Sequence, residues 1–404
     1  MKTLKYISLI VLATCFAQLA KAQFTLSGEF RPRTEFSHGY KTLAGENQDV
    51  STITAQRTRL NFGFTNEWIK TGLVLQDVRQ WGNQAQLVQN QDYAVSIHQA
   101  WAEVLFTPDF SLKAGRQELV YDDSRIFGNV GWAHQARSHD IALFKIEKEF
   151  KLHFGIAHNE NSDLTDSNYD GPDAYKDLQF VWFNNKWDNL GLSLLMLNNG
   201  VPVNTENEQK TKYSQTIGGR VTTAIESVKL ASNLYYQTGE HASGREISAL
   251  NFLLEASLKK FTLGYEYLSG TDYDETDFKS FTPLYGTNHK FNGFMDYFYV
   301  GNHGGSVGLN DVYLKYGYSK NKAGFDAHLH YFASAANISE SADNYLGTEL
   351  DLAASWLVQP QAKISIGLST LFAGSSMELL KGGDSSATQA WAYIMLSVTP
   401  DFIK

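Results

Sequence analysis

The chain has 404 residues and carries 43 acidic against 34 basic side chains, for a formal net charge of −9. This acidic balance argues against a nucleic-acid-binding protein, because such proteins present a basic face to the phosphates. A chain of this length normally predicts two or more soluble domains. No linker or low-complexity stretch divides it, however, and its 21 Tyr and 25 Phe are spread over the whole length. We therefore expect a single domain.

Residues 1–22 have the features of a secretory signal peptide. Lys2 and Lys5 form a short basic start, an apolar run follows, and the small-residue pattern of a signal-peptidase site ends at Ala22. The apolar run is far shorter than the ~20 residues of a membrane-spanning helix. We expect cleavage after Ala22, which leaves residues 23–404, without cysteine, as a barrel domain with a net charge of about −12. A lipoprotein site at Cys15 is the less favoured alternative.

After the leader, apolar and polar residues alternate with a period of two in segments of 8–13 residues, the pattern of half-buried β-strands. In one of them, for example, Phe261, Leu263 and Tyr265 alternate with Thr262 and Gly264. The eighteen such segments lie near 24–36, 53–65, 70–80, 94–106, 111–120, 138–147, 150–159, 178–184, 189–197, 212–224, 227–238, 248–258, 261–268, 309–318, 323–333, 344–356, 362–372 and 388–398.

The connections between these segments alternate between short and long. Each even-numbered segment is followed by a short link such as 66–69 or 259–260, and each odd-numbered one by a polar loop, up to about 40 residues at 269–308. This all-β pattern predicts a closed antiparallel transmembrane β-barrel with short periplasmic turns and long extracellular loops. Closure also leaves no open sheet edge in hydrocarbon. A soluble sandwich or propeller has alternating strands too, but does not predict the asymmetry of the loops.

The first segment carries a charged face and an apolar face. Phe30 and Phe36 occupy even positions, whereas the odd positions hold four charged residues, namely Glu29, Arg31, Arg33 and Glu35. In a barrel, the phenylalanines are expected to face lipid and the charges a watery lumen. Pro32 has no N–H to donate, so we expect an interruption or a bulge in the ladder at this position.

Arginines are concentrated in the first third of the mature chain. Eight of the ten lie between residues 31 and 137. Arg57 and Arg59 share a polar face, whereas Arg79 has the same parity as Leu73 and Leu75, so its facing is ambiguous. A guanidinium is always charged and pairs with carboxylates in a bidentate manner. We therefore expect a conduit for carboxylate-bearing solutes, with the candidate residues Arg31, Arg33, Arg57, Arg59, Arg79, Arg116 and Arg137, and with Glu29, Glu35, Asp77 and Glu103 interleaved.

Two alternatives to this conduit remain open. Rows of arginine and acidic residues also brace barrel walls without selecting a solute, which would make the protein a general porin or a porin for another substrate. A barrel enzyme is disfavoured, because the sequence offers no convincing nucleophile or acid pair beside a histidine. His328 and His330 share a face with Asp326, but such histidines more often simply line a pore.

One outer loop has the oxygen-ligand spacing of a calcium site. Its candidate ligands are Asp166, Asn168, Asp170 and Asp177, around a turn at Gly171. No helices flank the loop, and Pro172 occupies its seventh place. A structural calcium ion is therefore the specific hypothesis and a plain polar loop the alternative, and no other cofactor is expected.

Several motifs together resemble the alginate-export family of outer-membrane channels. They are "FTLSGEFRPRTEF", "QRTRLNF", "LQDVRQWG", "HQAWAEV", "LKAGRQELVYDDSRIFGNVGWAHQARSHD" and "PLYGTNHKFNGFMDYF". The resemblance implies a monomeric, eighteen-stranded barrel in the bacterial outer membrane. It also implies a lumen that passes an anionic uronate polysaccharide along the arginines named above. The implied partners are outer-membrane lipid, the anionic sugar, and periplasmic export or import components.

Overall fold

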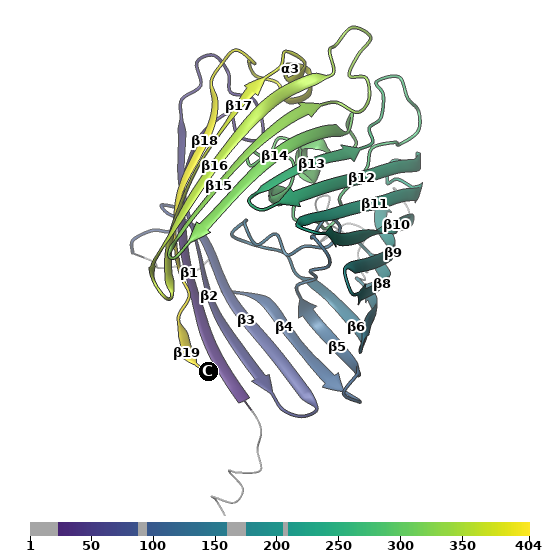
Figure 1. Ribbon diagram of the computed structural model, residues 1–404, viewed down its shortest axis with the longest axis vertical. Helices are drawn as coiled ribbons and strands as arrows, with labels where there is room; N and C mark the ends of the chain where they lie inside the picture. The colour runs from purple at the N-terminus through teal and green to yellow at the C-terminus, as the bar shows by residue number, and fades with distance from the viewer. Residues whose placement is uncertain (1–22, 88–94, 160–174, 205–208) are drawn as a thin grey trace, which may run out of the picture.

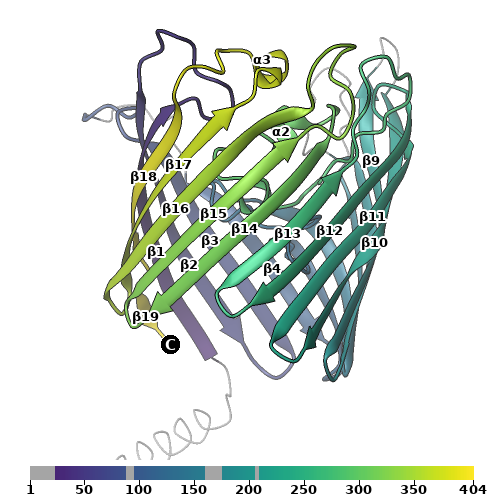
Figure 2. The ribbon, with the colours of Figure 1, turned by 45° about the horizontal axis from the view of Figure 1, so that its top comes forward.

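The computed structural model describes residues 23–87, 95–159, 175–204 and 209–404. The expected leader lies outside the described residues. Within them, eighteen antiparallel strands form a closed barrel, shown in Figures 1 and 2. Each strand pairs with the next one along the chain, and β1 (Gln23–His38) also pairs with β18 (Gln389–Val398), which closes the sheet. The prediction of a closed eighteen-stranded barrel is confirmed.

All eighteen predicted segments correspond to strands. The largest difference is at β9, which continues to Asn204 and pairs with β10 there, although the alternation stops at residue 197. The remaining strands are β2 (Ser51–Thr65), β3 (Ile69–Gln80), β4 (Ser96–Leu105), β5 (Phe110–Gln117), β6 (His139–Glu147), β7 (Phe150–His158), β8 (Asp177–Trp187), β9 (Leu190–Asn204), β10 (Gln209–Ile225), β11 (Val228–Glu240), β12 (Glu246–Leu258), β13 (Phe261–Leu268), β14 (Leu309–Lys320), β15 (Ala323–Ala333), β16 (Tyr345–Gln359), β17 (Ala362–Ala373) and a short β19 (Asp401–Ile403) on the edge of β1.

Short turns gather at one end of the barrel and long loops at the other (Figure 2). Several two-residue turns place a residue at positive φ, between 44° and 56°, as hairpins of this length require; these residues are Asp188, Glu226, Lys259 and Asn321. In the part of the chain that the structure describes, the loop end carries three short helices, η1 (Asn288–Lys290), α2 (Val300–His303) and α3 (Ser376–Lys381). Among the described residues, no helix has the length and apolar character needed to cross a membrane.

The first strand faces lipid and lumen as expected. Phe30 and Phe36 are 38% and 43% exposed on the outside, whereas Arg31 and Arg33 are 8% and 5% exposed on the inside. The ladder with β2 continues through Pro32, but the ladder with β18 skips residues 31 and 32 without a change of register. The missing N–H of Pro32 therefore leaves a gap on one side rather than a bulge.

Two long loops, 118–138 and 269–308, fold back into the barrel and fill much of its interior. Figure 1 shows the chain between β5 and β6 crossing the lumen. The Phe127 and Tyr285 rings stack with centroids 5.8 Å apart, and the Gly128 N–H donates to the Tyr285 carbonyl at 2.9 Å. The Met295 N–H reaches Glu349 Oε1 on the wall at 2.9 Å. The hydrophobic core therefore lies between the loops and the inner wall.

Candidate functional site

Four arginines lie on the lumen face of β1 and β2, where the 118–138 loop crosses the barrel. Arg31 is directly opposite Arg57, and Glu29 is opposite Arg59. The Glu29 carboxylate accepts hydrogen bonds from Arg57 Nη2 at 2.8 and 3.1 Å and lies 3.6 Å from Arg31 Nε. Because opposite charges attract across a ladder, Glu29 offsets the repulsion between the two facing guanidinium groups.

Arg31 and Arg57 direct most of their remaining donors at backbone carbonyls of the 118–138 loop. Arg31 Nη1 donates to the Gly131 carbonyl at 2.8 Å, and its Nη2 donates to Trp132 and Ala133 at 3.1 and 3.2 Å. Arg57 Nη1 makes longer bonds of 3.3–3.4 Å to the same stretch. Both side chains are buried. These two arginines therefore anchor the loop inside the lumen.

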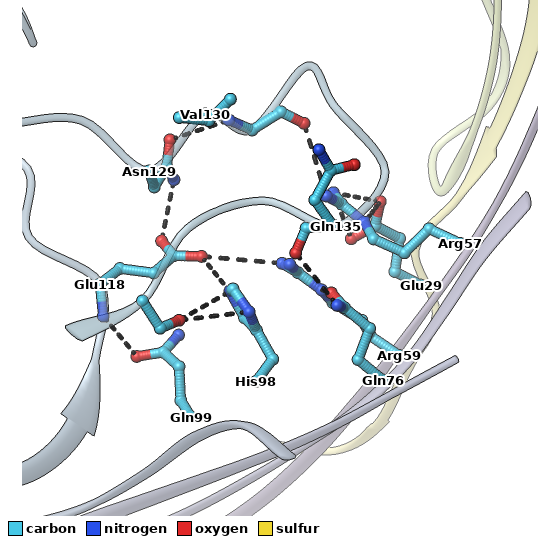
Figure 3. Close-up of polar contacts among 12 residues, drawn as sticks. Glu29, Arg57, Arg59, Gln76, His98, Gln99, Glu118, Asn129, Val130 and Gln135 are labelled. Carbon is cyan, nitrogen blue, oxygen red and sulfur yellow. Dashed lines mark hydrogen bonds and ion pairs between the residues drawn. The ribbon is translucent and has the colours of Figure 1, made fainter. Parts of the chain in front are cut away.

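Arg59 belongs to a neighbouring polar network, drawn in Figure 3. Its Nε donates to Gln76 Oε1 at 2.7 Å, and its Nη1 lies 3.7 Å from Glu118. Glu118 also contacts His98 Nε2 at 2.8 Å and accepts from Asn129 Nδ2 at 2.8 Å. Burial opposes ionisation of this carboxyl, but the bonds from His98 and Asn129 prevail and lower the pKa of Glu118. The network fixes the start of the 118–138 loop.

Arg33 contacts the loop differently, because its guanidinium lies against an aromatic ring. Its Cζ is 4.1 Å from the centre of the Trp132 ring, and its Nη1 donates to the Trp132 carbonyl at 2.8 Å. Glu35 lies 3.3 Å from Arg33 Nη2. Trp132 also has an aromatic partner: the His289 ring stacks on it with centroids 4.4 Å apart and planes 10° from parallel. The Trp132–His289 pair thus joins the two inward loops.

Two cavities meet at this stacked pair. The upper cavity, about 310 Å³, lies toward the loop end, between residues 40–41, 130–137 and 289–301. The lower cavity, about 370 Å³, lies toward the turn end and is bordered by Asp326, His328 and Tyr393. Trp132 and His289 line both. The ring pair is therefore the partition between the two spaces.

The upper cavity has more fixed cations than anions in its wall. Its charged lining residues are Arg33, Lys41 and Arg137 against Glu35 and Asp296. Burial, followed by the nearby arginines, lowers the pKa of His134 to about 3, so this lining residue is neutral. Burial opposes ionisation of Asp296, but His289, Tyr40 and Lys41 together lower its pKa, which favours the carboxylate. The cavity is thus suited to an anion with hydrogen-bonding groups.

Two of the expected lumen arginines, Arg79 and Arg116, face outward instead. Arg79 and Asp77 lie opposite Gln56 and Thr58 in the β2–β3 ladder, and Thr58 shares the outer face with its other neighbour, Phe30. Arg79 Nε bonds to Asp77 Oδ2 at 2.7 Å. The expectation that Asp77 and Arg79 face the lumen is therefore wrong.

Arg116 follows the same rule at the loop end of β5. The lumen-facing residues of this strand, Ser111 and Gln117, are odd-numbered and buried, so Arg116 points outward. Its Nη1 bonds to Asp140 Oδ2 of β6 at 2.7 Å. Polar pairs are tolerated here because the outer face leaves the apolar band near the loops. Arg116 is therefore not placed along the lumen, contrary to expectation.

Two further predicted residues face inward, but only one lies near the arginine cluster. Arg137 lines the upper cavity and donates from Nη1 to the Gly286 carbonyl at 3.2 Å. Glu103 lies on the lumen face of β4, where it accepts from Ser111 Oγ at 2.7 Å and Lys145 Nζ at 3.0 Å. It therefore stabilises a separate patch of the wall.

The candidate calcium ligands Asp166, Asn168 and Asp170 lie outside the described residues. The fourth, Asp177, opens β8. Its Oδ1 is 2.6 Å from His158 Nδ1 and its Oδ2 accepts from the Tyr213 hydroxyl at 2.9 Å.

Residues of the loops complete the cavity, and the strand pattern did not single them out. Trp132, Lys41, His289 and Asp296 lie in segments without alternation. Trp132 and His289 do fall within the motifs "GNVGWAHQARSHD" and "PLYGTNHKFNG". A dense, unusual motif in a long loop was thus the one signal available for them.

Together, the closed barrel, the lipid-facing apolar strands and the loop-lined cavities define a transmembrane β-barrel of the outer-membrane pore class. A model of the alginate export family matches residues 22–393. The chain belongs to this family, and it is a barrel protein of the bacterial outer membrane. A comparison with curated protein sequences finds no significant match.

Solved structures with the same architecture are Pseudomonas aeruginosa barrels of low sequence identity. OpdL superposes with a TM-score of 0.61 at 14% identity, over 94% of this chain and 99% of that one. OccK5 (OpdH) gives 0.60 at 13%, over 94% and 98%. OpdK, solved with vanillate, gives 0.57 at 10%, over 93% and 99%. At these identities the likeness concerns the fold.

Proposed function

We propose that this barrel is a channel for passive passage of an anionic, uronate-type polysaccharide or oligosaccharide. The observation that carries the proposal is the upper cavity, where Arg33, Lys41 and Arg137 meet beside the partition between the two cavities. Membership of the alginate export family supports the same class of solute. No covalent step is required, because the gradient of the solute drives passage.

The roles of the lumen arginines differ in this proposal. Arg31 and Arg57 are already bonded to carbonyls of the 118–138 loop, so they hold this loop in place where it narrows the lumen. Arg33 and Arg137 line the cavity and lower the electrostatic barrier for a carboxylate. Glu35 and Asp296 limit how tightly an anion is held, which conduction requires. Displacement of the Trp132–His289 pair would connect the upper and lower cavities.

The test is the reversal potential of the refolded mature chain in planar bilayers under a salt gradient, followed by addition of oligouronates. We expect anion preference and block by the oligouronates. Arg33→Gln and Arg137→Gln should each lower the permeability ratio roughly 2–5-fold, because the loss of one cavity-lining charge is expected to raise the barrier for an anion by about 0.5–1 kcal/mol.

Arg79→Gln and Arg116→Gln are matched controls, because they remove the same charge from the outer face. They should leave the ion preference and the oligouronate block unchanged. An open pore with neither anion preference nor block would contradict the proposal. The alternative, a general porin whose arginines only brace the loops, would then account for the conductance.

A further inference from the structure

A cluster of histidine and carboxylate side chains lies on the lumen wall formed by β15 and β16, which β17 and β18 separate from β1. His328 and His330 project inward from β15, and Asp351 of β16 is the direct cross-strand partner of His328. One ligand-type atom from each of the three side chains lies within 4.8 Å of the others. Imidazole nitrogen and carboxylate oxygen are ligands that Zn²⁺ accepts in three-residue protein sites.

The Asp351 carboxyl group is 0% exposed and lies beside Ser369 and the carboxyl group of Glu349. Among the described residues, neither of its oxygens has a hydrogen-bond donor in good geometry. Glu349, two positions along the same face, is also 0% exposed, and its Oε2 lacks a donor in the same part of the chain. Burying unpaired carboxylates side by side is costly unless a cation compensates them. A cation bound beside these two carboxyl groups would supply that compensation.

His330 is already oriented as a metal ligand. Its Nδ1 lies 2.9 and 3.0 Å from the two carboxylate oxygens of Asp311 on β14. Asp311 is itself held by Asn292 Nδ2 at 3.1 Å. A carboxylate on one ring nitrogen fixes the tautomer, so that Nε2 is left with its lone pair for a metal, as in many protein zinc sites. The proton on Nδ1 is inferred from this contact.

The site has a route from the lumen. His328 is half-buried and lines the lower cavity beside Asp326 and Lys290. Its ring also packs on Phe294 with centroids 5.0 Å apart. Lys315, its cross-strand neighbour on β14, has its Nζ 4.2 Å from the centre of the Tyr313 ring. An ion can therefore reach the cluster past the half-buried histidine.

We infer that His328, His330 and Asp351 bind a divalent transition-metal ion, with Zn²⁺ as the best match to two imidazoles and one carboxylate. Ligand bonds of about 2.0–2.2 Å require the donor atoms to approach to roughly 3.4 Å. The half-buried His328 ring closes the remaining distance on binding. Three protein ligands leave one coordination position for water or a solute oxygen on the side of the lower cavity. The ion would also neutralise the buried Asp351 and Glu349.

The test is metal binding by the refolded, tag-free chain. Zn²⁺ titration by calorimetry should give one site per barrel with micromolar or tighter affinity, and Co²⁺ should give visible d–d absorption bands that Zn²⁺ abolishes. His328→Gln and Asp351→Asn should each weaken Zn²⁺ binding at least 10-fold. Asp326→Asn is the matched control, because it removes a carboxylate from the same cavity and strand face but not from the cluster.

Heat-dependent mobility on detergent gels should establish that each variant is folded. If Asp351→Asn fails to fold, His328→Gln, at a half-buried position, still tests whether the cluster binds Zn²⁺. Absence of Zn²⁺ and Co²⁺ binding at micromolar concentration would overturn the inference. Binding that both cluster variants retain at full strength would overturn it as well, because the ion would then occupy another place. Neither outcome bears on the ion preference of the channel, which the arginine variants test separately.

Discussion

The surroundings of each arginine decide what its charge contributes. Arg125, in the 118–138 loop, lies 2.8 Å from Glu266 of β13, and both side chains are 1% exposed. Arg116 lies 2.7 Å from Asp140, but these side chains are 42% and 60% exposed. Water can solvate either charge of the outer pair after its partner is lost. It cannot reach the inner pair, where the surviving charge would remain uncompensated.

Arg125→Met is therefore expected to lower the free energy of unfolding by about 3–5 kcal/mol. Arg116→Met, the matched control, should lower it by no more than about 1 kcal/mol. Urea unfolding of the refolded protein in lipid vesicles measures both. Adding Glu266→Gln to Arg125→Met should recover much of the loss, because it removes the stranded charge. Equal losses for Arg125→Met and Arg116→Met would show that the inner pair is not desolvated.

At the scale of elements, strands and loops differ in what the sequence predicts. A strand between lipid and lumen must alternate apolar and polar side chains. This period of two therefore located all eighteen strands and predicted that Arg31 and Arg57 face the lumen. Near the loops the outer face of the barrel is no longer in hydrocarbon, so a charged side chain there can face either outward or into the lumen. Arg79 and Arg116 lie there, and they were assigned to the lumen by their charge and their motifs, although the parity of Arg79 left its facing open.

Loop positions were less predictable for a different reason. The 118–138 and 269–308 loops fold inward through contacts between residues far apart in sequence, such as Phe127 with Tyr285. No local period reports such contacts. The sequence therefore predicted that arginines line the lumen, but not that a loop bonds to two of them. It also paired His328 and His330 with Asp326, whereas the cross-strand register brings Asp351 to them.

Helix α3 carries a half-buried lysine that should make its docking depend on pH. Lys381 Nζ donates to the Asn302 carbonyl of the 269–308 loop at 2.8 Å, and burial lowers the pKa of Lys381 to about 7. When α3 is undocked, this lysine keeps its proton up to about pH 10.4. Between these values the undocked state binds more protons, so docking becomes more favourable as pH rises from 7 to 10. Below pH 7 the dependence disappears.

Hydrogen exchange of the 376–388 backbone, corrected for the intrinsic pH dependence, measures this effect. Protection should rise between pH 7 and 9 in the wild type and stay flat in Lys381→Met, which cannot titrate. Lys279→Met removes an exposed lysine of the 269–308 loop and should keep the wild-type slope. A rise in protection that Lys381→Met shares would assign the pH dependence to another group.

At the scale of the whole molecule, closure exposes one continuous apolar band to the membrane. Side chains that would form a core in a soluble protein lie outside, among them Leu234 (56% exposed) and Leu258 (44% exposed). The inside is filled by loops and polar networks. The contribution of an outer side chain to stability therefore depends on its depth in the bilayer as well as on packing. The same substitution is expected to lower the free energy of unfolding by different amounts at different positions along one face.

Leu234→Arg should be far more destabilising than Leu258→Arg. Leu234 lies midway along β11, whereas Leu258 is the last residue of β12, beside the 259–260 turn. An arginine at the bilayer midplane costs about 2–4 kcal/mol and one near the interface about 0–1 kcal/mol. Urea unfolding in phosphatidylcholine vesicles should resolve this difference. Equal costs at the two positions would mean that the apolar band is not centred on the middle of the strands, and that the barrel sits at another height in the membrane.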